Sequence, residues 1–111
     1  MISNVKNISN ITFESSNHLG ISKKVIFSNI ETISNIRQIA YTEIAAGFEV
    51  EQHCHDTMEE FFIIVEGSCE FLLDGNKFLC SKDSIIRVAP KTIHSIKAIT
   101  CSKVFYFGVA I

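Results

Sequence analysis

Short runs of β-branched and aromatic residues alternate with turn signals along most of the chain. The turn signals recur about every ten residues, and we find no convincing long helical pattern. The strongest of them, Asp74-Gly75, predicts a hairpin between residues 68–73 and 77–80. The remaining predicted strands cover residues 23–28, 35–45, 49–55, 61–67, 84–89, 94–99 and 103–111. So many short strands in 111 residues predict an all-β sandwich or barrel.

Several of these strands are apolar on both faces. In residues 61–65, positions 61, 63 and 65 face one side and positions 62 and 64 face the other, yet all five are apolar. Such a strand needs cover on both faces, and a single barrel covers only its inner one. The simplest cover is a second copy, so we predict a homodimer. Cover by the chain's own N-terminal segment is the alternative for one of the strands.

Length and charge narrow the class of protein. The chain has the size of one domain, and we divide it into a partly ordered N-terminal segment, residues 1–20, and a single barrel, residues 21–111. The formal net charge of −2, without a basic stripe, argues against nucleic acid and anionic membrane as partners. No apolar run approaches the roughly 18 residues that span a bilayer. The first residues lack the apolar region of a secretory signal, so we expect a cytoplasmic protein.

The four cysteines do not form a CxxC pair, which argues against a structural zinc site built from them. In the cytoplasm they should be reduced. The Asp74-Gly75 hairpin places Cys69 opposite Cys80. We interpret this pair as two adjacent buried thiols rather than a disulfide.

Two histidines, His53 and His55, are separated by one residue in a predicted strand. Residues at i and i+2 of a strand point to the same face, so the two imidazoles can converge on one ion while Cys54 points away. Glu59 and Glu60 follow a short turn, and only one of them can lie on the histidines' face.

A third histidine, His94, follows a turn that contains Pro90. Two or three neutral imidazoles with one carboxylate form a common site for a divalent first-row metal with open positions. An ordinary polar corner of the surface is the alternative interpretation of the same residues.

Gly47, His53, His55, Glu60 and Gly67 are separated by five, one, four and six residues, and this spacing resembles the first signature motif of the cupin superfamily. A second cupin motif is degraded here and keeps only its histidine. The positions of its other members hold Asp83, Ala89, Lys91 and Ala98 in place of Gly, Pro, Gly and Asn. The resemblance covers roughly residues 22–110.

The resemblance implies a small double-stranded β-helix, or jelly-roll barrel, with one central metal. It carries over His53, His55, Glu60 and His94 as ligands, and thereby selects Glu60 over Glu59. Iron, nickel, manganese, zinc and cobalt all suit such ligands. Cupins include enzymes that act on small polar metabolites, so the resemblance suggests a carbohydrate-related isomerase or epimerase, or a dioxygenase. A non-catalytic, metal-dependent ligand-binding or sensor protein is the alternative.

Three further polar residues are candidates for catalysis: Arg87, Tyr41 and Tyr106. Arg87 lies in an otherwise apolar strand and could bind a substrate carboxylate or phosphate, or pair outward with an acid. Tyr41 and Tyr106 could donate protons, or could belong to the core with a tethered hydroxyl. His18 lies outside the cupin-like region, and we expect it to be exposed.

Overall fold

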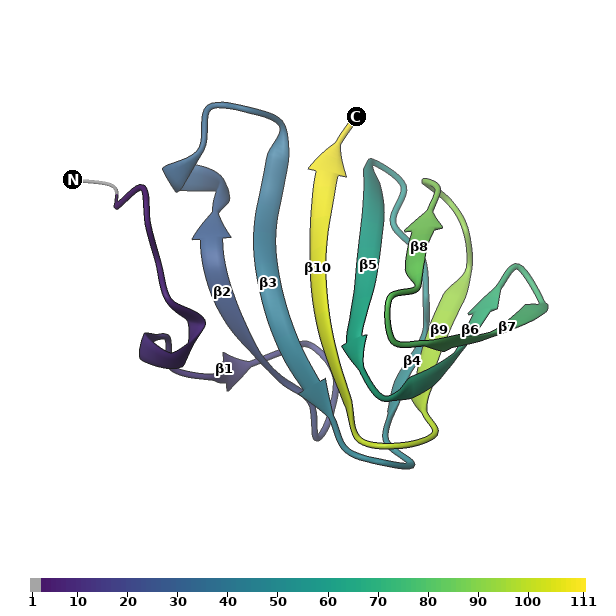
Figure 1. The fold of residues 1–111 in the computed structure, drawn as a ribbon. Coiled ribbons are helices and arrows are strands. Elements are labelled where there is room, and N and C mark those ends of the chain that lie inside the picture. Colours follow the sequence, from purple (N-terminus) through teal and green to yellow (C-terminus); the bar gives the residue numbers. More distant parts are fainter. Residues whose placement is uncertain (1–2) are drawn as a thin grey trace.

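Two antiparallel β-sheets face each other in the computed structural model, which describes residues 3–111 (Figure 1). The larger sheet has the strand order β1-β2-β3-β10-β5-β8, and the smaller has the order β4-β9-β6-β7. The larger sheet consists of β1 (Glu14–Ser15), β2 (Ser22–Ser28), β3 (Ile36–Ile44), β10 (Ser102–Ala110), β5 (Met58–Glu66) and β8 (Ile85–Val88). The smaller consists of β4 (Glu49–His53), β9 (His94–Ala98), β6 (Ser68–Leu73) and β7 (Asn76–Ser81). The predicted all-β jelly-roll barrel is confirmed.

The only helical elements in residues 3–111 are two 3-10 turns, η1 (Ile8–Asn10) and η2 (Asn29–Glu31). No helix in that part of the chain is long and apolar enough to cross a membrane. The predicted hairpin is present, and Asp74 (φ 47°) and Gly75 (φ 83°) both have the positive φ that a two-residue hairpin turn of this type requires. It pairs Cys69 with Cys80, and both thiols are buried and free, as the sequence predicts.

The core fills the space between the sheets. Phe62 and Ile64 of β5 point inward, and Phe62 meets Phe71 of β6 with ring centroids 5.5 Å apart. Phe71 and Ile64 are fully buried. Burying each such side chain stabilises the fold by about 1.5–3 kcal/mol. Alternation along β5 therefore turns Phe61 and Ile63 to the outer face of the larger sheet.

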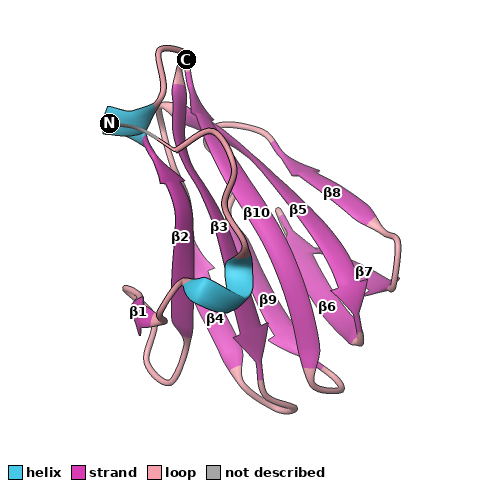
Figure 2. Ribbon diagram, turned by 60° about the vertical axis from the view of Figure 1, so that its left-hand side comes forward, coloured by secondary structure: helices cyan, strands magenta, loops and turns pink. Residues whose placement is uncertain are grey.

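Residues 3–13 of the N-terminal segment lie against the outer face of the larger sheet (Figure 2). The Lys24 ammonium donates a hydrogen bond to the Ile8 carbonyl (2.7 Å) and lies 4.8 Å from the centroid of the Phe13 ring. Phe13 in turn approaches Tyr41 of β3, with centroids 6.5 Å apart. The chain thus covers part of its own outer face over β2 and β3.

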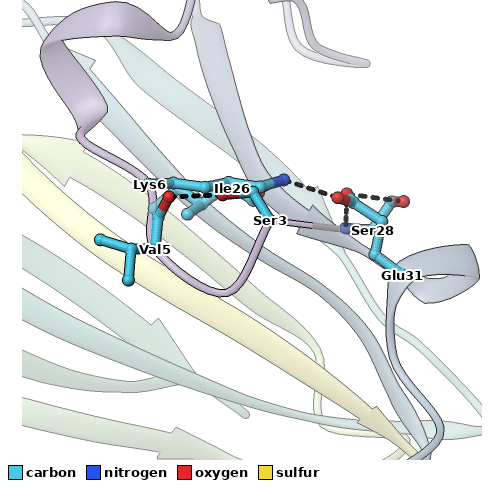
Figure 3. Close-up of polar contacts among 6 residues, drawn as sticks. All are labelled: Ser3, Val5, Lys6, Ile26, Ser28 and Glu31. Carbon is cyan, nitrogen blue, oxygen red and sulfur yellow. Dashed lines mark hydrogen bonds and ion pairs between the residues drawn. The ribbon is translucent and has the colours of Figure 1, made fainter. Parts of the chain in front are cut away.

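A second contact fixes the start of this segment (Figure 3). The Lys6 ammonium donates to the Ile26 carbonyl (2.7 Å) and to the Glu31 carboxylate (2.6 Å). Glu31 also accepts from the Ser28 amide and hydroxyl, and the nearby Lys6 holds the pKa of the Glu31 carboxyl below its usual range. The segment is ordered by these contacts rather than by a long strand.

Candidate metal centre

Four side chains converge where the ends of the two sheets meet: His53, His55, Glu60 and His94, called here the His–Glu cluster. His53 ends β4 and His94 begins β9, and the two are paired in the ladder between these strands. Glu60 comes from β5 of the other sheet, and His55 lies in the loop after β4. One ligand atom from each residue lies within 4.8 Å of the others.

The strands differ slightly from the predicted ones around this cluster. The strand expected to run through residues 49–55 ends at His53, and the next begins at Met58 rather than at residue 61. His55 is therefore held by a loop, yet its ring centroid is still only 5.0 Å from that of His53. Cys54 is exposed between them. The loop therefore brings the His55 and His53 rings together, as a continuous strand was expected to do.

Backbone carbonyls determine which ring nitrogen of two histidines is free. The Nδ1 atoms of His53 and His94 lie 2.8 Å from the carbonyl oxygens of Glu51 and Thr92. A carbonyl can only accept, so each neutral ring carries its proton on Nδ1 and leaves the lone pair of Nε2 unused. Such hydrogen bonds are the usual way in which proteins orient metal-binding histidines.

The Glu60 carboxylate has no donor of its own in this arrangement. Its Oε1 lies 3.2 Å from Nε2 of His55 and 3.2 Å from Nε2 of His94. Among the described residues, Glu60 Oε1 and His94 Nε2 are buried with no well-oriented hydrogen-bond partner, although they face each other. Buried polar atoms without partners are costly. A cation between these lone pairs would satisfy both, so the residues fit a divalent metal.

Burial lowers the pKa of His53, which favours the neutral ring that a metal requires. Burial acts to lower the pKa of His94, but the Glu60 carboxylate and the Thr92 carbonyl together outweigh it, so the net effect raises that pKa. The metal-free cluster thus favours a proton on His94 at low pH. A metal ion has to displace that proton, so its binding weakens as the pH falls.

A cavity of about 140 Å³ adjoins the His–Glu cluster between the sheets. One wall of it is formed by residues 16–18 of the N-terminal segment. The His18 ring lies 5.0 Å from that of His53, and its side chain is only 22% exposed. The expectation of an exposed His18 is therefore wrong. The β1–β2 hairpin brings it there, and no spacing motif in the sequence marks it.

Tyr106 is the one of the three catalytic candidates whose side chain lines the cavity. Its ring stacks on Phe62 with centroids 5.6 Å apart. Burial, and then the charge of Glu60, raises the pKa of Tyr106 from 10.0 to about 12. The phenol is therefore neutral near pH 7 and can donate a proton or a hydrogen bond into the cavity.

Arg87 and Tyr41 point away from the cavity. Arg87 is exposed on β8 and pairs with Glu59, the neighbour of Glu60 on the opposite face of the sheet. Tyr41 lies on the outer face of β3, where its hydroxyl donates to Glu43 (2.8 Å), and burial raises its pKa. The inward orientation considered for Arg87 does not occur, because alternation along β8 turns Ile86 and Val88 inward instead.

Comparison with known proteins identifies a family that the chain matches. A family model described as "Cupin domain" matches residues 40–107. An uncharacterized protein of Methanocaldococcus jannaschii is 35% identical over 63 residues, which are 57% of this chain and 50% of that protein. The chain therefore spans about half the length of this curated relative.

Solved structures share the fold. A predicted oxalate decarboxylase from Thermotoga maritima superposes with a TM-score of 0.89 at 21% identity, over 96% of this chain and 99% of that one. Ectoine synthase from P. lautus superposes with a TM-score of 0.82 at 14% identity, over 96% and 77% of the two chains. At such identities the likeness concerns the fold alone.

Proposed function

This chain belongs to the cupin family, and on that premise we propose that it is a metal-dependent enzyme acting on a small polar metabolite. The ligands of the metal are His53, His55, Glu60 and His94. The convergence of these four side chains beside a cavity, with Glu60 Oε1 and His94 Nε2 buried and unpartnered, is the observation that carries the proposal. Nitrogen and carboxylate donors suit iron, nickel, manganese, zinc or cobalt.

A divalent metal in this position supplies Lewis-acid polarisation of a substrate oxygen, or redox chemistry if it is iron. The chain itself supplies a cavity of defined shape. Phe62 supports the Tyr106 ring, and Tyr106 holds its proton on the hydroxyl oxygen at neutral pH, within the cavity. Such a group can protonate a substrate oxygen or carbon as charge develops there. This suits an isomerase or epimerase of a carbohydrate-related substrate, with a dioxygenase as a second reaction class.

Replacing Tyr106 with phenylalanine tests the catalytic role, and Tyr41→Phe is the matched control. We expect Tyr106→Phe to lower kcat by about 10²- to 10⁴-fold without changing metal content, because it removes only the proton donor. Tyr41→Phe should leave kcat near that of the wild type, since its hydroxyl bonds Glu43 on the outer face. The assay uses metal-loaded protein with panels of sugars, keto acids and diketones.

Absence of turnover across these panels, with stoichiometric metal bound, would overturn the enzymatic proposal. The alternative, a non-catalytic metal-dependent ligand-binding or sensor protein, would then take its place. Equal loss of activity in both tyrosine variants would instead contradict the specific role of Tyr106.

The outer face of β5, β8 and β10 supports a homodimer. Phe61 and Phe107 stack there with centroids 5.1 Å apart, and Ile85, which is paired with Ile63 across the β5–β8 ladder, is 71% exposed. We propose that a second copy covers this face. In sedimentation analysis the wild type should be a dimer, and Ile85→Glu should yield monomers.

The matched control is Leu79→Glu, because Leu79 is 76% exposed on β7 of the other sheet. It should leave the dimer intact. A wild type that sediments as a monomer at micromolar concentration would rule the dimer out.

We also propose a cytoplasmic location. Cys69 and Cys80 are paired across the β6–β7 hairpin but remain free thiols, as do Cys54 and Cys101. Unbridged neighbouring thiols are typical of a reducing compartment.

A further inference from the structure

Lys23 is a cation on the inner side of the larger sheet. It is paired with Thr42 in the β2–β3 ladder, and the buried Thr42 side chain lines the cavity. Residues opposite each other in a ladder share a face, so Lys23 points inward as well, and it too lines the cavity. Its neighbour Lys24 points outward to the N-terminal segment. Only one of two adjacent lysines therefore reaches the interior.

The Lys23 ammonium has a neutral partner only. It donates to the side-chain oxygen of Gln38 at 3.3 Å, and no carboxylate within residues 3–111 forms an ion pair with it. Two other lysines do have such pairs, Lys6 with Glu31 and Lys103 with Glu66. A partly buried ammonium is better stabilised by an anion than by an amide.

Two carboxylates contribute acidic charge around Lys23 and the cavity, Glu14 and Glu60. Glu14 is its register partner in β1, but this residue is exposed and forms no ion pair with it. Among the residues that the structure describes, Glu60 is the only acidic one that lines the cavity. A divalent ion and the Lys23 ammonium together carry three positive charges, more than the carboxylates of Glu14 and Glu60 can balance, so the loaded cavity favours an anionic ligand.

The size of the cavity limits that ligand. About 140 Å³ suits a ligand that has a chain of a few carbons. Gln38 also prepares the site for an anion. Because its oxygen accepts from Lys23, its amide group remains free to donate to the same ligand.

We propose that the cavity binds a short-chain organic dicarboxylate. One carboxylate lies at Lys23 and Gln38, and the other end of the molecule faces the His–Glu cluster. This inference rests on the proposed function, because it takes the metal as the second point of attachment. It narrows the small polar metabolite to an acid and makes Lys23 the residue that selects for it.

Calorimetric titration of cobalt-loaded protein with malonate and succinate tests the proposal, with malonamide and succinamide as neutral isosteres. We expect at least one of the two acids to bind and neither amide to do so. Lys23→Met should weaken binding of the acid by about 10- to 100-fold, because one charged hydrogen bond is lost. Lys77→Met makes the same change of charge at an exposed position of β7 and should have less than a twofold effect.

The visible spectrum of bound cobalt distinguishes failure of the dicarboxylate site from failure of the metal site. If Lys23→Met keeps the wild-type spectrum and loses the acid, the inference stands. The inference fails if the spectrum is normal and one of three results is found: neither acid binds, inorganic phosphate binds in place of the acids, or the two lysine variants bind the acids with equal affinity. In each of these cases the proposed metal site is still supported. If the wild type binds no cobalt, the proposed function fails, and this inference fails with it.

Discussion

We expect Glu60→Gln to lower the affinity for zinc by about 100-fold or more. Replacing a residue that only supports a metal ligand already lowers the affinity by about 10- to 100-fold, and the loss of a ligand should be at least as large. The glutamine has almost the same shape but lacks the charge, and its carboxamide is a much poorer ligand for a divalent transition metal. Glu60 is also the only acid among the four converging side chains. The affinity is measured by competition with a chromophoric chelator at fixed pH.

The matched control is Glu59→Gln, one residue away on the opposite face of β5. Glu59 pairs with Arg87 at the surface, and exposed pairs of this kind contribute about 0–1 kcal/mol to stability. This variant should bind zinc within twofold of the wild type. Equal zinc affinities in the wild type and Glu60→Gln, or equal losses in the two variants, would contradict the assignment of Glu60 as a ligand.

Gly67→Ala should lower the free energy of unfolding by about 2–5 kcal/mol, since strain in a left-handed residue adds to overpacking. Gly67 has φ +89°, and a Cβ there would lie 2.3 Å from the Cys101 carbonyl oxygen and 2.8 Å from the Ser102 Cα. Both are backbone atoms of the chain that leads into β10, so they cannot rotate away. Urea unfolding at an unchanged m-value gives the difference.

Gly47 offers a control with the same backbone strain. Its φ is +85°, but a Cβ there would meet nothing within 4 Å. Gly47→Ala should therefore cost only the strain, about 1–2 kcal/mol. Equal effects at the two glycines would show that residues 101–102 yield to the added methyl group, and that the close approach at Gly67 does not constrain the fold.

Residues within the first cupin motif could be placed from the sequence because its spacing and strand alternation act together. Alternation put Phe62 and Ile64 on one face of β5, and the structure buries both. The same alternation separates Glu60 from Glu59, and the fixed distance to Gly67 selects Glu60. The resemblance to cupins predicted that four ligands converge, and the structure brings together His53, His55, Glu60 and His94. A loop rather than a strand carries His55.

Three residues outside that motif, Arg87, Lys23 and His18, could not be placed, for physical reasons. Both neighbours of Arg87 and the residue before them, Ile85, are apolar, so the sequence pattern of β8 does not reveal that Arg87 points outward. Pairing with β5 decides it. Lys23 lies next to Lys24, and only the register with β3 shows which one faces inward. His18 reaches the cavity because the β1–β2 hairpin folds residues 16–18 over it, and two-residue strands leave no pattern in a sequence.

A zinc-loaded crystal, with anomalous scattering measured on both sides of the zinc absorption edge, tests whether the His–Glu cluster binds the metal. We expect one peak per chain, bonded at about 2.0–2.2 Å to a ring nitrogen of each of the three histidines and to a carboxylate oxygen of Glu60. For His53 and His94 the bonded atom is Nε2, because Nδ1 is held by a backbone carbonyl. A peak bound elsewhere on the chain, or no peak at the His–Glu cluster in protein saturated with zinc, would contradict this assignment.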